Sequence, residues 1–225
     1  MYGMNKFKKL VIIMPAFNEE QVIQNVIKNL ESVGFKNILV VDDGSKDKTV
    51  KEAKKTGVVV LTHLVNIGLG GALSTGLTYA KLKNYKYAIT VDSDGQHNIN
   101  DVEKIATELL KNKYDFVIGS RLKDMQSTNK MRYIGNHLLD IFTFLLSRKY
   151  VEDSQSGLRG FNKKALDKIV IDSTGYEVSS EIIVKAVKAK IKIKTISIDA
   201  IYSNYTLKKG QKISNVFRLV RKLLW

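Results

Sequence analysis

Short apolar runs alternate with helix-like segments through the first half of the chain, and this alternation restricts the fold more than any other feature. Strands that are apolar on both faces are typical of a parallel sheet with helices on both sides. The alternation therefore predicts an α/β fold with a mostly parallel sheet. The apolar runs are residues 10–14, 37–41, 58–61, 87–91 and 115–119, and the helix-like segments are residues 19–33, 47–56, 70–82 and 100–112.

The second half of the chain is organised differently, because the alternation ends after Arg121. A chain of 225 residues suffices for one sizeable core, so we expect one domain over residues 1–211, followed by a helix at 212–225. The expected elements in between are a helix at 132–148, a loop and strand at 153–161, helices at 163–170 and 177–189, and a strand within 192–203.

Residues 56–80 contain no charged side chain and are numerous enough to span a bilayer. The segment contains five glycines, with His63 and Asn66 among them, and its apolar residues separate into a short run and a later helical pattern. We therefore expect a strand, a loop and a buried helix rather than a transmembrane helix. The N-terminal residues pass from a basic stretch directly into the first apolar run, so we also expect no secretory signal.

The chain is strongly basic, with a formal net charge of +15, and its charge is unevenly distributed. Residues 185–225 contain eleven Lys or Arg against one acidic residue, and all six arginines lie beyond residue 120. Because the guanidinium group suits bidentate phosphate binding, we expect phosphate contacts in the second half. The absence of cysteine excludes disulfide scaffolds, thiolate nucleophiles and cysteine-ligated zinc.

Polar and acidic residues follow three of the predicted strands. The first strand ends in PAFNEE, residues 15–20, and the second ends in DDGS, residues 42–45. Either motif alone could be an ordinary turn leading into a helix, and Asn100 with Glu103 has the form of a capping box at a later helix. Because ligands bind beyond the carboxyl ends of the strands in such sheets, we expect the strand ends to form one site.

The fourth strand ends in the sharpest local motif, DSDGQH, residues 92–97. Asp92, Asp94 and Gln96 offer hard oxygen ligands within a short arc, and Mg²⁺ and Mn²⁺ prefer such ligands. A calcium-binding loop is excluded, because its sixth position requires glycine and is His97 here. We expect His97 to be a loop residue, or a residue that supports a ligand, rather than a ligand itself. A dinucleotide fingerprint also fails, because Leu73 occupies the third glycine position.

Together these motifs resemble the family 2 glycosyltransferases of the GT-A fold, and the resemblance covers nearly the whole chain. Within that family the pattern most resembles the polyprenyl-phosphate or dolichol-phosphate sugar synthases. The resemblance implies metal-dependent, inverting transfer of a sugar from a UDP- or GDP-linked donor. The motifs, in chain order, are PAFNEE at 15–20, VDDGS at 41–45, NIGLGGAL at 66–73, VDSDGQH at 91–97, GSR at 119–121 and SQSGLRGF at 154–161.

The resemblance also implies roles for individual residues. Asp92, Asp94 and Gln96 would hold Mg²⁺ or Mn²⁺ and the diphosphate. Arg121, Arg132 and Asn136 would contact the phosphate of a polyprenyl acceptor. The residues implied to bind the donor nucleotide sugar are Pro15, Phe17, Glu19, Val41, Asp43, Val91, Asp92, Ser93 and Lys212. The region around Lys212 reads KKGQKIS and lacks the serine of the Gly-x-Ser-Lys motif with which these synthases usually end.

The identity of the acceptor decides what catalysis requires. A phosphate monoester is largely dianionic at neutral pH, so it would need positioning by Arg121 and Arg132 more than deprotonation. The alternative acceptor is a hydroxyl of a surface glycan or glycolipid, which would need a general base, and Asp153 is then the candidate. Asp153 could equally be a donor-binding or structural carboxylate.

The predicted helix at 212–225 is basic and amphipathic and ends in Trp225. Such a helix suits a lipid headgroup interface, so we expect a cytoplasmic protein that associates peripherally with the inner face of the membrane. The alternative is a helix packed on the domain with a solvated basic face. A basic nucleic-acid-binding module is a remote third possibility, since carboxylates at the strand ends would repel phosphates and no basic and aromatic interleaving occurs. The sequence leaves the oligomeric state open.

Overall fold

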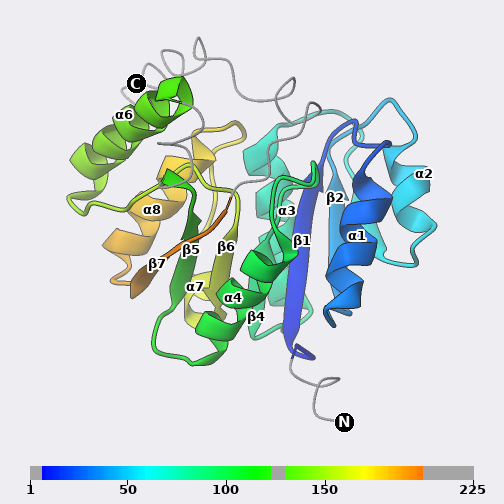
Figure 1. Cartoon of the computed structure of the whole chain (residues 1–225), viewed down its shortest axis with the longest axis horizontal. Coiled ribbons are helices and arrows are strands. Elements are labelled where there is room, and N and C mark those ends of the chain that lie inside the picture. The colour runs from blue at the N-terminus through cyan, green and yellow to red at the C-terminus, as the bar shows by residue number, and fades with distance from the viewer. Residues whose placement is uncertain (1–6, 123–129, 200–225) are drawn as a thin grey trace.

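The computed structural model describes residues 7–122 and 130–199, which form one seven-stranded sheet between two layers of helices (Figure 1). The strand order is β3-β2-β1-β4-β6-β5-β7. The strands are β1 (Leu10–Ala16), β2 (Ile38–Asp42), β3 (Val59–Thr62), β4 (Tyr87–Thr90), β5 (Phe116–Ser120), β6 (Arg159–Asn162) and β7 (Ile193–Ser197). The expected helix at 212–225 lies outside the described residues, and so does the proposed boundary at residue 211.

Helices cover both faces of the sheet, as the apolar runs predict. Their apolar positions belong to two separate buried clusters, one on each face. The helices α1 (Ile23–Ser32), α2 (Thr49–Lys54) and α4 (Ile99–Leu110) contribute to one cluster, and α3 (Leu69–Leu82), α7 (Lys163–Lys168) and α8 (Val178–Lys188) contribute to the other. The remaining described helix, α6 (Lys130–Ser147), packs mainly on α8.

The sheet is mostly parallel, and β6 is its one antiparallel strand among the described residues. β6 lies between β4 and β5 and runs against both, with Thr90 of β4 paired to Arg159 at the start of β6. The first residues of β6 therefore lie at the edge where β1, β2, β4 and β5 end. The expected parallel sheet is confirmed, and the insertion of β6 is the departure from it.

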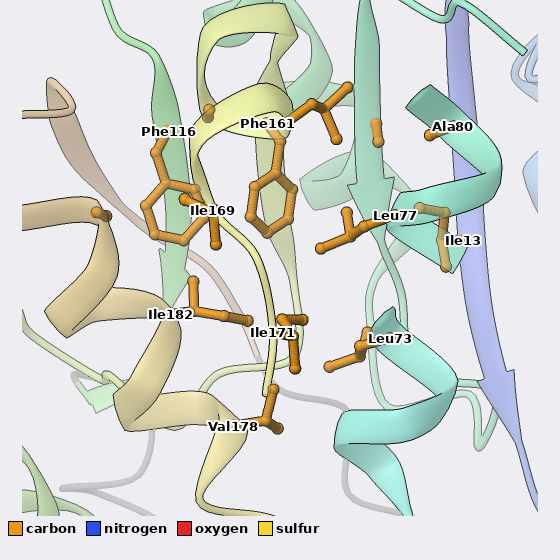
Figure 2. Packing of buried hydrophobic residues seen from close by; sticks show 14 of the residues in the cluster. Ile13, Leu73, Leu77, Ala80, Phe116, Phe161, Ile169, Ile171, Val178 and Ile182 are labelled. Atoms are coloured by element: carbon orange, nitrogen blue, oxygen red, sulfur yellow. The ribbon is translucent and has the colours of Figure 1, made fainter. Parts of the chain in front are cut away.

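The cluster beneath α3, α7 and α8 joins the two halves of the chain. Phe116 of β5 and Phe161 of β6 have ring centroids 4.8 Å apart and face Leu77 of α3 and Ile182 of α8 (Figure 2). Fully burying side chains of this size contributes about 1.5–3 kcal/mol each. The described residues from β5 onward therefore share a buried cluster with those of the first half.

Several boundaries differ from those expected. α4 is capped by Asn98, whose side chain accepts a hydrogen bond from the backbone N–H of Asn100, so the expected cap at Asn100 is wrong by two residues. An Asn two residues earlier can bond the same free N–H groups. The loop and strand expected at 153–161 are both present, and the strand begins at Arg159. The uncharged segment is β3, a loop and α3, and no helix of the described residues is long and apolar enough to cross a membrane.

Candidate active site

A cavity of about 650 Å³ opens at the carboxyl edge of the sheet. It lies where the ends of β1, β2, β4 and β5 meet the start of β6, as expected for a parallel α/β sheet. The sequence-predicted residues that line it are Pro15, Phe17, Glu19, Asp43, Asp92, Ser93, Asp94, Gln96, Arg121 and Asn136. Residues of the NIGLGGAL and SQSGLRGF motifs also line it, so all six motifs share one cavity.

The other predicted residues do not line the cavity in the described part of the structure. The side chains of Val41 and Val91 are buried in the two hydrophobic clusters, so a bound donor could meet them only through their backbone. Asp153 is fully buried behind the cavity wall. Arg132 falls in the first turn of α6, but its side chain lies outside the described residues, and so does Lys212.

The exit of β1 is held by hydrogen bonds from neighbouring loops. Ser93 donates from Oγ to the backbone oxygen of Pro15 at 2.8 Å, which ties the end of β1 to the loop after β4. The backbone N–H of Glu19 donates to Thr49 Oγ1 at 2.7 Å, and the Glu19 side chain is nearly buried in the cavity wall. Phe17 is 42% exposed, so its ring is available to a ligand.

Asp43 organises the loop that leads into α3. Its Oδ1 accepts hydrogen bonds from the backbone N–H of Ile67 at 3.0 Å and from His63 Nδ1 at 2.8 Å, and its Oδ2 accepts one from the N–H of Gly68 at 2.8 Å. Gly68 has a φ of 97°, which favours glycine. The carboxylate thus shapes the cavity wall as well as lining it. Sequence reasoning gave His63 no role, because no local motif surrounds it.

The acidic motif after β4 places two carboxylates with opposite pKa shifts side by side. Burial raises the pKa of the Asp94 carboxyl to about 6, and the negative charge of Asp92 adds to this. Burial also acts to raise the pKa of Asp92, but the hydrogen bond from His97 and the positive charges of Arg121 and Arg159 hold it below its usual range. His97 Nε2 lies 3.1 Å from Asp92 Oδ2, which makes His97 a partner of the carboxylate.

Gln96 completes this motif by bonding to Asp94 twice. Its backbone N–H donates to Asp94 Oδ1 at 3.0 Å, and its side-chain amide donates to Asp94 Oδ2 at 2.7 Å, which leaves the amide oxygen to accept or to ligate. Asp92 remains 35% exposed to the cavity. Two carboxylates and an amide oxygen fit a hard divalent ion such as Mg²⁺ or Mn²⁺. The described residues contain no cluster of three or more His, Cys, Asp or Glu suited to a metal, so water or substrate would supply further ligands.

The loop before β6 fits closely around Asp92. A Cβ placed on Gly157 would lie 2.6 Å from the Asp92 carboxyl carbon, so only glycine leaves room for this carboxylate. Thr90 Oγ1 donates to the backbone oxygen of Gly157 at 2.7 Å and holds the loop in place. The SQSGLRGF motif thus forms the floor beneath the acidic motif.

Arg159 is a site residue that sequence reasoning did not assign, although it lies within that motif. It is buried in the cavity wall, donates from one guanidinium nitrogen to the backbone oxygen of Ser154 at 2.8 Å, and has an Nε without a partner. Burial lowers the pKa of Arg159 to about 10, so the group stays charged at neutral pH. Its position beside β4 depends on the antiparallel pairing, which has no local signal.

Arg121 and Asp153 form a buried bidentate ion pair. Arg121 donates from Nε and from its backbone N–H to Asp153 Oδ2 and from a terminal nitrogen to Oδ1, each at 2.8 Å. Asp153 has a φ of 50°, a left-handed backbone that is uncommon outside glycine. Its backbone N–H donates to Asp140 Oδ2 of α6 at 2.9 Å. Both oxygens of Asp153 are therefore engaged in orienting Arg121.

Comparison with known proteins shows the family to which the chain belongs. The model of glycosyl transferase family 2 matches residues 11–170, and the chain belongs to this family. A Methanocaldococcus jannaschii protein of uncharacterized function is 46% identical over 96% of this chain and 91% of its own length. A Methanococcus voltae protein named UDP-N-acetylglucosamine–dolichyl-phosphate N-acetylglucosaminyltransferase is 36% identical over 96% of this chain and 95% of its own.

The solved structures support the same fold. Glucosyl-3-phosphoglycerate synthase from Mycobacterium tuberculosis, solved with Mn²⁺, uridine diphosphate and phosphoglyceric acid, superposes with a TM-score of 0.74. The match covers 96% of this chain and 75% of that one at 17% identity. The expected GT-A fold and the expected glycosyltransferase class are therefore confirmed.

Proposed function

We propose that this glycosyltransferase transfers a sugar from a UDP- or GDP-linked donor to a polyprenyl phosphate of the dolichyl kind, with inversion at the anomeric carbon. The observation that carries the proposal is one cavity lined by carboxylates from the ends of β1, β2 and β4 and by arginines at β5 and β6. The name of the Methanococcus voltae relative, which pairs a UDP-linked sugar with dolichyl phosphate, supports it.

The donor half of the site consists of residues from β1, β2 and the loop after β4. Asp92, Asp94 and Gln96 would hold Mg²⁺ or Mn²⁺, and a bound ion would supply positive charge to the leaving diphosphate. Phe17 offers a ring face to the base, and Glu19 and Asp43 offer carboxylates to ribose hydroxyls. The donor would contact Val41 and Val91 only through their backbone atoms. Pro15, Ser93 and Lys212 complete the proposed donor-binding residues.

The acceptor half consists of Arg121, Asn136 and Arg132, with Asp153 as the positioning residue for Arg121. One phosphate oxygen of the lipid attacks the anomeric carbon as the bond to the nucleoside diphosphate breaks, which yields a lipid-phosphate sugar. This oxygen is already charged at neutral pH, so the reaction needs no general base. The engagement of both Asp153 oxygens by Arg121 favours this acceptor over a hydroxyl.

The experiment is a panel of UDP- and GDP-linked sugars with Mn²⁺, assayed with and without a short, water-soluble polyprenyl phosphate. We expect a lipid-phosphate sugar with one donor, only when both Mn²⁺ and the lipid phosphate are present. Transfer to a glycan or glycolipid hydroxyl at a comparable rate would reject the proposed acceptor. Turnover that is unchanged by a chelator would reject the proposed metal.

We also propose that the protein works at the cytoplasmic face of the membrane. The basic amphipathic pattern of residues 212–225 supports binding to anionic headgroups, each basic residue contributing about 1 kcal/mol near such a surface. Replacing Arg218 and Arg221 with serine should weaken binding to anionic vesicles at low salt. Unchanged binding would reject a role of this segment in membrane binding and favour a helix that packs on the domain.

A further inference from the structure

The helix α6 carries more exposed large hydrophobic side chains than any other described element. Fifteen large hydrophobic side chains are exposed among the described residues, and six of them lie on α6. Ile134, Leu138, Ile141 and Leu145 form its centre, and each is between 42% and 59% exposed. At about 100° per residue these four fall on one stripe about 16 Å long. Scattered exposed apolar residues are ordinary, but a contiguous stripe marks an interaction surface.

The opposite face of α6 is already occupied, which fixes the direction of the stripe. Leu139 is buried, and Thr143 Oγ1 lies 2.8 Å from Ser180 Oγ of α8. Asp140 accepts hydrogen bonds from the backbone N–H groups of Asp153 and Ser154 at 2.9 and 2.7 Å. The helix is thus anchored to the loop that holds Arg121, and the stripe faces away from the domain.

Charge selects among the possible occupants of the stripe. Asp140 is the one acidic residue in the sequence of α6, and it is fully buried. Arg148 and Lys149 are exposed directly after the helix, followed by Tyr150, which is half exposed. The basic segment 212–225 would find no acidic side chain on this face of α6, and a second copy would bring like charges together. Anionic lipid headgroups complement the basic residues, and the acyl region complements the stripe.

We propose that the outer face of α6 is a docking surface for an anionic lipid bilayer. Asn136 lines the cavity from the side of the same helix opposite the stripe, so docking brings the acceptor side of the cavity to within about one helix diameter, roughly 10–12 Å, of the membrane. This link to catalysis rests on the proposed polyprenyl-phosphate acceptor, whereas the docking surface itself does not. Membrane docking through α6 is separate from any contribution of residues 212–225.

The chain has no cysteine, so single cysteines can be placed and labelled cleanly in the full-length protein. Leu138→Cys and Leu145→Cys would carry a polarity-sensitive fluorophore on the stripe. Leu82→Cys is the matched control, because Leu82 is the last residue of α3 and is 80% exposed. With vesicles of phosphatidylcholine and phosphatidylglycerol, we expect a blue shift at both α6 positions and none at Leu82.

Three results would overturn the proposal. The label on α6 could fail to respond to vesicles, it could already be shielded without vesicles at every protein concentration, or its shielding could grow with protein concentration. The second result would indicate that another part of the chain covers the stripe, and the third would indicate self-association.

A variant pair tests the energetic contribution of the stripe. Leu138→Gln with Leu145→Gln should weaken binding to the anionic vesicles about tenfold or more, whereas Leu82→Gln should not change it. The pair should keep its activity toward a short, water-soluble polyprenyl phosphate, which shows that the fold and site are intact. Equal vesicle affinity of the pair and the wild type would overturn the proposal. Vesicle-dependent shielding of α6 without transfer to any polyprenyl phosphate would support the docking surface while rejecting the proposed function.

Discussion

The two walls of the cavity carry opposite charges, and each wall comes from a different part of the chain. Among the described lining residues, the charged side chains contributed by the first hundred residues are carboxylates: Glu19, Asp43, Asp92 and Asp94. The charged side chains contributed from β5 onward are Arg121 and Arg159. A phosphate can therefore bind directly to one wall, whereas it can bind to the other only with a cation between.

The pKa values of the two central carboxylates reflect the same division. Desolvation acts to raise the pKa of Asp92, but His97 and the two nearby arginines hold it below its usual range. Asp94 is two residues further on, and burial together with the charge of Asp92 raises its pKa to about 6. The carboxylate near the arginines is therefore stabilised in its charged form, whereas the one further away is not. Asp94 would gain the missing positive charge from a bound cation.

Asp94→Asn is expected to have the largest effect, because it removes a charged ligand from the carboxylate wall. We expect kcat to fall by about a hundredfold or more with Mn²⁺ present. Radiolabelled donor and initial rates measure this, with circular dichroism to check the fold. Asp172→Asn, at a carboxylate that is 80% exposed outside the cavity, is the control. Retained activity in Asp94→Asn would remove this residue from the metal site.

Arg121→Lys tests the other wall while keeping a positive charge beside Asp153. Lysine cannot reproduce the bidentate contacts, so we expect kcat/KM for a short polyprenyl phosphate to fall about tenfold to a hundredfold. The KM for the donor should stay unchanged. Arg148→Lys, at an exposed arginine, should behave as wild type. An equal loss for donor and acceptor would contradict the division between the walls.

Gly157→Ala tests the contact at which the two walls meet. The new methyl group would displace the Asp92 carboxylate, so we expect activity to fall about tenfold and the free energy of unfolding to drop by about 1–3 kcal/mol. Gly135→Ala is the matched control, because nothing lies within 4 Å of its added Cβ, and alanine in a helix is favourable. Thermal denaturation and initial rates would measure both effects, and a fully active Gly157→Ala protein would show that this fit does not matter.

The smallest expected effect is the pH dependence of Mn²⁺ binding. It can be measured on the wild-type protein, with one variant as the control. The Asp94 pKa of about 6 means that protons compete with the metal as the pH falls through this value. The apparent affinity should therefore decrease by up to about tenfold per pH unit below about pH 6. Calorimetry at about pH 7 and about pH 5 measures this, and Asp94→Asn should lose the dependence. Equal affinities at the two pH values would place the pKa of Asp94 elsewhere.

The carboxylate wall could be predicted from the sequence, because it depends on local features that parallel topology brings together. The apolar runs mark β1, β2 and β4, and the residues that follow them, such as Glu19, Asp43 and Asp92, meet at one edge whatever the details of packing. The alternation of runs and helices was also sufficient for the fold class. Helix ends such as that at Asn98 were less certain, because neighbouring polar residues can cap equally well.

The sequence by itself determined the elements and the carboxylate half of the site, whereas tertiary structure decided the rest. The insertion of β6 between β4 and β5 places Gly157 and Arg159 beneath Asp92, and this pairing spans about 70 residues with no local pattern to indicate it. The engagement of Asp153 by Arg121 likewise depends on two loops that meet only in the folded protein. The sequence pattern shows which positions of a helix are apolar. Only the packing shows which of these positions stay exposed, as they do on α6.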